Sequence, residues 1–151
     1  MPRVEKLIIQ VLCYATEDPK KVLKAVENVL GADAAKKTSM SSERLEGYYG
    51  DPITLMRIFL LDRELCEKVL LRILSNLSNS EREELWRDRS KLGRHGGKLY
   101  IRLDKQEAFL GRIRLSDKDP IRMVAELRGN VEALRRRLEE KLQAMRAEDR
   151  P

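Results

Sequence analysis

Apolar and polar side chains alternate along residues 98–104 (KLYIRLD), and this alternation limits the fold more than any other feature of the chain. Successive side chains of a β-strand point to opposite faces of its sheet. The segment therefore predicts a half-buried strand, with its two leucines and Ile101 directed toward a core. Residues 111–115 and 121–127 alternate in the same way, so we expect a C-terminal β-meander with one apolar face and one polar face.

Three further strands are predicted in the N-terminal half of the chain. Residues 4–14 and 53–61 are rich in Val, Ile and Leu, which is typical of buried strands. Residues 36–46 are polar and contain neither Pro nor Gly, so they predict an exposed strand near a sheet edge. The turn signals at 47–52 indicate that this edge strand pairs with 53–61 as a hairpin.

Two amphipathic helices are predicted between these strands. Asp18 and Asp62 stand at N-cap positions, and the apolar periodicity that follows them ends near Gly31 and Ser78. We expect one or two more helical turns at 81–89, a flexible basic loop at 90–97 and a short connector or helical turn at 105–110. The predicted fold class is α+β, with the order β-α-β-β-α-β-β, or one further strand in the final meander, and two helices packed on one face of the sheet.

A chain of 151 residues is the size of one ordinary domain. We assign residues 1–128 to the α+β domain and residues 129–151 to a charged amphipathic helix that begins after Asn130. Its apolar seam consists of Val131, Leu134, Leu138, Leu142 and Met145. Such a narrow seam is compatible with packing on the domain, pairing with a partner helix or remaining in solvent.

Charge is the clearest compositional pointer to a ligand. Charged residues make up 37% of the chain, and the net charge is +6 with a pI near 9.4. The surplus of both signs indicates a protein from a hot environment. The positive field should attract polyanions, and nucleic acid is the first candidate, although the same surplus also serves solubility.

Signs of catalysis, metal binding or membrane insertion are missing from the sequence. Cys13 and Cys66 lie alone within apolar runs, as buried reduced thiols do, and the single histidine, His95, has no neighbouring nucleophile or carboxylate. The N-terminal apolar run is too short and interrupted for a membrane helix. We therefore expect a cytoplasmic protein without cofactor, metal or catalytic residues.

The polar face of the predicted meander is the candidate site. Alternation places Lys98, Tyr100 and Arg102 on this face. If the neighbouring strands are adjacent, the surface combines cations with an aromatic ring, and the predicted set is Lys98, Arg102, Arg112, Arg114 and Arg122 around Tyr100, with Arg94 and His95 on the preceding loop. Arginine binds phosphates and stacks on bases, and tyrosine offers a ring to an unstacked base, so RNA suits this surface. Solvated side chains paired with nearby carboxylates are the alternative.

A second aromatic site is predicted in the glycine-flanked turn at 47–50. Tyr48 and Tyr49 could stack on a base there, or one of the rings could cover the edge of the core.

Several stretches in this order resemble the archaeal RNA-binding family that is described as a predicted exosome subunit. The matching stretches are ATED at 15–18 with KVL at 21–23, EGYYGDPI at 46–53, LYIRLDKQ at 99–106 and AFLG at 108–111. Together they frame residues 5–127. The resemblance implies a fold like that of ribosomal protein L5, the β-α-β-β-α-β-β order, an archaeal cytoplasm and RNA as the ligand.

These observations predict a non-catalytic RNA-binding protein, an accessory factor in archaeal RNA processing or exosome function. The alternative is a dimeric interaction or assembly module without direct RNA contact. In that case the chain would associate with itself through the leucines of the C-terminal helix or through the 39–45 edge.

Overall fold

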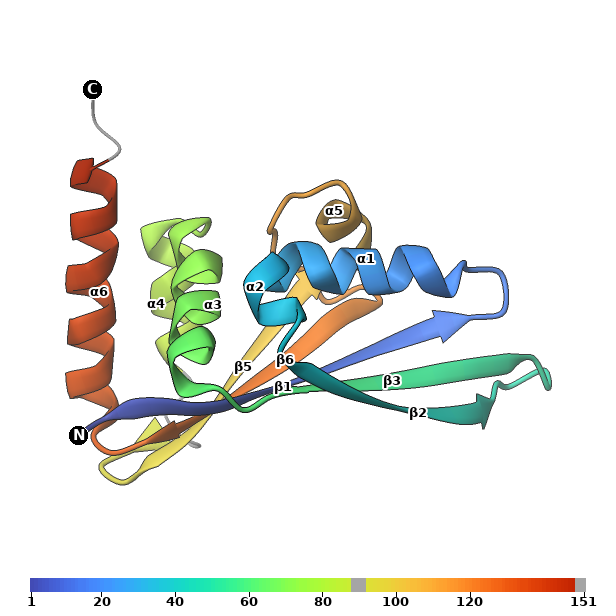
Figure 1. The fold of residues 1–151 in the computed structure, drawn as a ribbon, viewed down its shortest axis with the longest axis horizontal. Coiled ribbons are helices and arrows are strands. Elements are labelled where there is room, and N and C mark those ends of the chain that lie inside the picture. The colour runs from blue at the N-terminus through green and yellow to red at the C-terminus, as the bar shows by residue number, and fades with distance from the viewer. Residues whose placement is uncertain (88–91, 149–151) are drawn as a thin grey trace.

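The computed structural model describes residues 1–87 and 92–148, which form one twisted antiparallel sheet with every helix on the same side of it (Figure 1). The strands are β1 (Arg3–Tyr14), β2 (Thr38–Glu46), β3 (Pro52–Leu60), β4 (Leu92–Gly93), β5 (Gly96–Asp104) and β6 (Pro120–Arg128). The helices are α1 (Pro19–Leu30), α2 (Ala32–Ala35), α3 (Arg63–Ser75), α4 (Asn79–Arg87), α5 (Lys105–Phe109) and α6 (Val131–Glu148).

The strands are arranged in the order β2-β3-β1-β6-β5-β4, and every neighbouring pair is antiparallel. The predicted α+β class and the main β-α-β-β-α-β-β order are confirmed. The predicted hairpin is the β2–β3 arm, which extends beyond the helices (Figure 1). β2 is the edge strand, and eight of its nine residues are exposed, as predicted.

Capping and amphipathicity explain the two main helices. The Asp18 carboxylate accepts a hydrogen bond from the backbone N–H of Lys20 at 2.9 Å, and Asp62 accepts one from Leu65 at 3.1 Å. Each helix turns its apolar stripe toward the sheet and buries it there. The predicted helices are thus confirmed, and their common side leaves the other face of the sheet uncovered.

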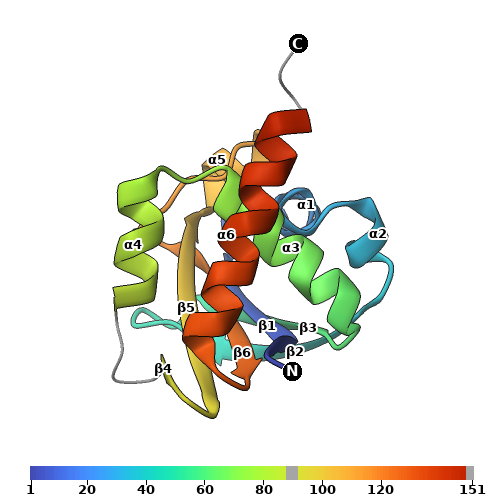
Figure 2. The ribbon, with the colours of Figure 1, turned by 90° about the vertical axis from the view of Figure 1, so that its left-hand side faces the viewer.

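The C-terminal helix packs on the domain, which decides between the three arrangements that its seam allowed. Leu134 and Leu138 are fully buried, and Figure 2 shows α6 beside α3 and α4. Polar contacts fix its position, because Arg137 and Lys141 reach the Glu67 carboxylate on α3 at 2.6 and 2.5 Å. The seam residues Val131, Leu134, Leu138 and Leu142 therefore belong to the core, whereas Met145 is 38% exposed and lies outside it.

The prediction of a strand at 111–115 is wrong. Helix α5 occupies 105–109 and is capped by the Asp104 side chain. Shortly after its end, Gly111 turns the chain with a φ of +85°. The following residues cross over the edge of β5 with a single bridge between Leu103 and Leu115. Apolar and polar residues do alternate along 111–115, but five residues that begin with a glycine are too few to form a paired strand directly after a helix.

The flexible loop predicted at 90–97 is also corrected where the structure describes it. Residues 88–91, and with them the end of the predicted turns at 81–89, lie outside the described residues. Residues 92–97 form a tight β4–β5 hairpin around Arg94 and His95. Gly96 is needed there, because its φ is +120° and a Cβ at this position would lie 2.2 Å from the Leu127 carbonyl oxygen.

Candidate nucleic-acid interface

The uncovered face of the sheet carries the centre of the predicted site. In the β5–β6 register Lys98 pairs with Glu126, Tyr100 with Val124 and Arg102 with Arg122. Because directly paired residues share a face, these side chains all lie on the side away from the helices. The prediction that Lys98, Tyr100, Arg102 and Arg122 share one face is confirmed.

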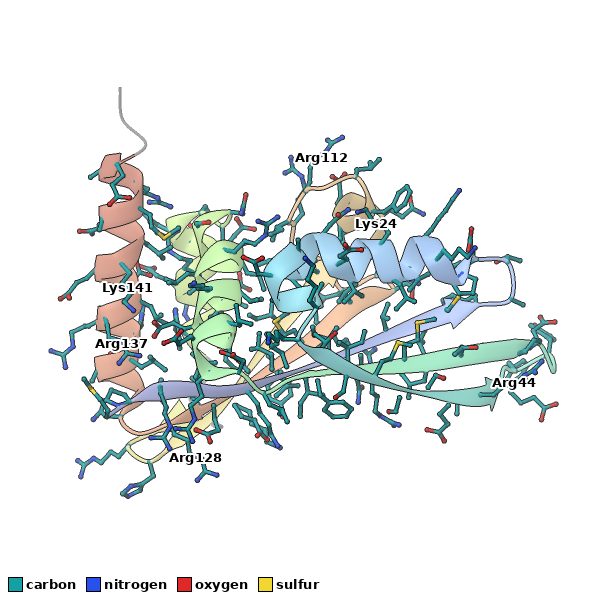
Figure 3. All side chains as sticks on the ribbon, in the orientation of Figure 1. Lys24, Arg44, Arg112, Arg128, Arg137 and Lys141 are labelled. Atoms are coloured by element: carbon teal, nitrogen blue, oxygen red, sulfur yellow. The ribbon has the colours of Figure 1, made fainter. Side chains whose placement is uncertain are left out.

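Lys6 and Arg128, which were not among the predicted site residues, lie on the same face. Lys6 of β1 is paired with Glu126 in the sheet, and Arg128 ends β6. Figure 3 shows Arg128 projecting from the uncovered side. The alternation within 4–14 could have identified Lys6, but the strand as a whole looked buried. We call Lys6, Lys98, Arg102, Arg122 and Arg128 the basic surface.

Few carboxylates neutralise the basic surface. Glu126 lies 3.2 Å from the Lys6 ammonium and 4.0 Å from that of Lys98, while Arg102 lies 3.7 Å from Asp117, whose side chain is 90% exposed. Such exposed pairs are weak and exchange readily for another anion. Arg122 and Arg128 have no ion pair with any of the described residues. Within the described residues, the five cations of the basic surface therefore form ion pairs with two carboxylates, Glu126 and Asp117, and the surface keeps a surplus of positive charge.

Arg112 and Arg114 do not belong to the basic surface, which corrects the prediction. Both lie in the connection after α5, and their Nε atoms are 3.4 and 3.7 Å from the Glu107 Oε2 atom. Figure 3 shows Arg112 on the helix side of the sheet, opposite Arg128. The reason is the missing strand at 111–115, because without strand geometry the alternation of side chains does not determine the face on which they lie.

Arg94 and His95 extend the basic surface at one end. They form the exposed turn between β4 and β5, and the backbone N–H of Gly129 donates to the His95 carbonyl oxygen at 3.3 Å. This bond holds the turn beside Arg128, whose sheet partner is Gly96. The predicted proximity of the turn to the cationic face is therefore confirmed.

Tyr48 and Tyr49 are separate from the basic surface. They occupy the tip of the β2–β3 arm, where their side chains are 95% and 87% exposed and their ring centroids are 5.0 Å apart in an edge-on arrangement. At least seven residues along β3, from Phe59 to Pro52, and three strand spacings, from Phe59 to Tyr100, separate this tip from Tyr100, which is a distance of at least roughly 25 Å. Neither ring covers the core edge. Whether they contact RNA stays a prediction.

An apolar row crosses the open face beside the cations, and the sequence did not predict it. The row consists of Phe59, Ile8, Val124 and Tyr100, which are direct cross-strand neighbours on β3, β1, β6 and β5. All four side chains are at least partly exposed. Residues 4–14 and 53–61 were interpreted as buried strands, and this interpretation holds only for their alternate residues.

A buried ammonium group lies at the far end of β1. The Lys105 Nζ atom is 2.8 Å from the Leu12 carbonyl oxygen, 2.9 Å from Glu17 and 2.8 Å from Asp119. Burial alone would lower the pKa of Lys105, but the hydrogen bonds from the ammonium to Asp119 and Glu17 outweigh burial and raise it. The group therefore stays charged and ties β1 to the segment before β6.

The described part of the chain carries neither a metal site nor a membrane-spanning helix. Residues 1–87 and 92–148 contain no cluster of three or more potential metal ligands, and no helix among them is long and apolar enough to cross a membrane. Burial raises the pKa of the Cys66 thiol to about 11, so this thiol is not activated.

Comparison with known proteins assigns the family. The sequence model of the RNA-binding family, described as "RNA binding", matches residues 6–127. RNA-binding protein PAB1135 of Pyrococcus abyssi is 32% identical over 114 residues, which cover 75% of this chain and 74% of that protein. The uncharacterized protein MJ0213 of Methanocaldococcus jannaschii is 29% identical over 116 residues, or 75% of this chain and 76% of that protein.

Solved structures share the fold. Mth689, a DUF54 protein from Methanothermobacter thermautotrophicus, superimposes with a TM-score of 0.70 at 27% identity, covering 90% of this chain and 98% of that chain. SSO0741 from Sulfolobus solfataricus has a TM-score of 0.65 at 23% identity, with 93% and 98% covered, and shows the fold alone. The matched residues 6–127 include every member of the basic surface except Arg128, and by this match the chain belongs to the RNA-binding family.

Proposed function

We propose that this protein binds RNA through the basic surface on the open face of its sheet. The observation that carries the proposal is the gathering of five cations from three adjacent strands against two weakly paired carboxylates. Membership of the RNA-binding family supports RNA as the polyanion.

The chemistry of the side chains matches this ligand. Arg102 and Arg122 are cross-strand partners, and their planar guanidinium groups can each bind a phosphate through two hydrogen bonds. Tyr100 lies beside them with 39% of its side chain exposed, and its ring can stack on a base. Arg94, His95 and Arg128 would continue the phosphate contacts toward the β4–β5 turn.

The biological role that we propose is non-catalytic. The protein would act as an accessory factor in RNA processing, such as exosome function, in the archaeal cytoplasm. The support for this finer assignment is the resemblance of the motif stretches to the predicted exosome subunit. The similarity to the L5 fold also stays a prediction.

Self-association is the second candidate, and the edge strand β2 favours it. β2 has nine residues, and its outer side pairs with no strand among the described residues. The leucines of α6 no longer offer a route to a dimer, because they are buried within the chain. Light scattering of the wild type and of Ser41→Pro, which blocks pairing at this edge, distinguishes a β2-mediated dimer from a monomer.

The RNA proposal is tested by fluorescence anisotropy across a salt series. The test variant is Arg102→Gln/Arg122→Gln. The matched control is Arg112→Gln/Arg114→Gln, which removes the same charge from the helix side of the sheet. Each phosphate contact to a single strand contributes about 0.7 to the slope of log affinity against log salt, so the test variant should lower the slope by about 1.4.

The control variant should keep the wild-type slope within error. Equal effects of both variants would mean that net charge alone attracts RNA. Absence of RNA binding by the folded wild type at low salt would refute the proposed function.

A further inference from the structure

The open face has a layered pattern that the basic surface alone does not explain. The apolar row lies between two rows that contain cations, each two residues away along the strands, which is about 7 Å. On one side are Lys98, Glu126 and Lys6; on the other are Arg102, Arg122, Gln10 and Arg57. An aromatic ring therefore stands at each end of an apolar strip that has positive charge along both sides.

This pattern differs from what a duplex would need. An RNA double helix presents phosphates and 2′-hydroxyl groups, while its bases are stacked inside and their faces are inaccessible. A cationic surface alone suffices to bind it. Uncovered apolar side chains between cations would remain unused and would be desolvated without a partner.

An unpaired strand has the complementary chemistry. Its bases have apolar faces that stack on aromatic rings, and its single backbone carries one phosphate per nucleotide, which cations beside the row of bases can contact. Phe59 and Tyr100 are three strand spacings apart, about 14 Å, which corresponds to about four nucleotides at a stacked rise of 3.4 Å.

We propose that the open face is a site for single-stranded RNA that runs across the strands, with Phe59 as the stacking residue at the β3 end and Tyr100 at the β5 end. This inference rests on the proposed function and adds the substrate class, the direction of the strand and the role of Phe59. Arg122 is the nearest unpaired cation in the described residues to the centre of the path.

The chain provides a matched control for the test, because it contains only two phenylalanines. Phe59 lies on the open face, whereas Phe109 lies on α5 among the helices, with 41% of its side chain exposed. Phe59→Leu and Phe109→Leu both keep an apolar side chain and remove a ring. Because Phe59 is only partly buried and Leu retains its packing, both variants should fold, as circular dichroism would verify.

The probes are a fluorescein-labelled 12-nucleotide oligouridylate and a 12-base-pair RNA duplex, compared by anisotropy at low salt. Stacking of one base on an aromatic ring corresponds to a loss of about 5- to 100-fold when the ring is removed. We expect Phe59→Leu to lose this much affinity for the oligouridylate and little for the duplex, while Phe109→Leu matches the wild type. Tyr100→Leu should reproduce the loss from the other end.

Two results would overturn the inference while leaving RNA binding intact. One is equal binding of the oligouridylate by Phe59→Leu and Phe109→Leu. The other is wild-type binding to the duplex that is as tight as, or tighter than, binding to the single strand. If the folded wild type binds neither probe, the proposed function fails together with this inference.

Discussion

Replacing Lys105 with methionine should destabilise the protein markedly, although Lys105 does not belong to the basic surface. Its side chain is 7% exposed and donates to three acceptors on two segments, the end of β1 with the turn after it and the segment before β6. Its ammonium group also lies 5.2 Å from the centre of the Tyr14 ring. Methionine has a similar length and can fill the space, but it donates no hydrogen bond.

The magnitude follows from what remains after the substitution. The side chains of Glu17 and Asp119 are 30% and 42% exposed, so their carboxylates can regain water, whereas the Leu12 carbonyl oxygen loses its donor in a partly buried position. Charge-assisted hydrogen bonds contribute about 1.5 to 3 kcal/mol each before this rehydration, so a net loss of about 3 kcal/mol is expected. For a chain of this size, that corresponds to a fall in Tm of roughly 6 to 12 °C.

Calorimetry of Lys105→Met beside Lys21→Met measures the effect, because Lys21 is exposed on the neighbouring face of α1 and should cost little. The raised pKa of Lys105 also determines how stability depends on pH. The contribution of Lys105 to the free energy of unfolding is complete below its ordinary pKa near 10.5 and is lost as the pH rises through the raised pKa. A fall in Tm within 2 °C of the control would refute the view that this ammonium group joins the two segments.

Two other sites give further predictions. Burial opposes the ionisation of Glu67, but the hydrogen bonds from Lys141 and Arg137 outweigh burial and lower the pKa of Glu67 below 4.5. The contribution of Glu67 to stability is therefore present above pH 4.5 and is lost as the pH falls through the lowered pKa. Urea unfolding should therefore show Glu67→Gln to be less stable by about 1 to 2 kcal/mol at pH 7 and to lose less stability than the wild type below pH 4. Tyr48→Ser/Tyr49→Ser should leave the affinity for the 12-nucleotide oligouridylate within about twofold, because the tip lies roughly 25 Å from Tyr100. A larger loss in anisotropy would make these tyrosines RNA contacts.

Regular patterns along the sequence predicted most of the fold. The strand at 98–104 and the strand at 121–127 each alternate over seven residues, which is long enough to determine both the element and its faces. Asp18 and Asp62 marked the starts of α1 and α3 because capping is a local interaction. The members of the site that lie on these two strands were accordingly placed on the correct face.

The errors arise where distant contacts decide the structure. Residues 111–115 alternate, but α5 and Gly111 direct them over the sheet edge, and Arg112 and Arg114 move with them. Lys105 looked like part of a polar connector, and its burial depends on Glu17, a residue 88 positions earlier. Nothing in the local sequence around either residue indicates that they meet.

The partial exposure of Phe59 and Ile8 is informative about function because folding does not require it. The core is already formed by the opposite faces of β1 and β3, where Leu7, Ile9 and Leu60 are fully buried. A sheet face that only met water would be satisfied by polar residues, as it is in β2 with Ser39 and Ser41. An apolar strip kept on the same face as the basic surface is therefore better explained by a ligand that has both apolar faces and negative charge, and an unpaired RNA strand has both.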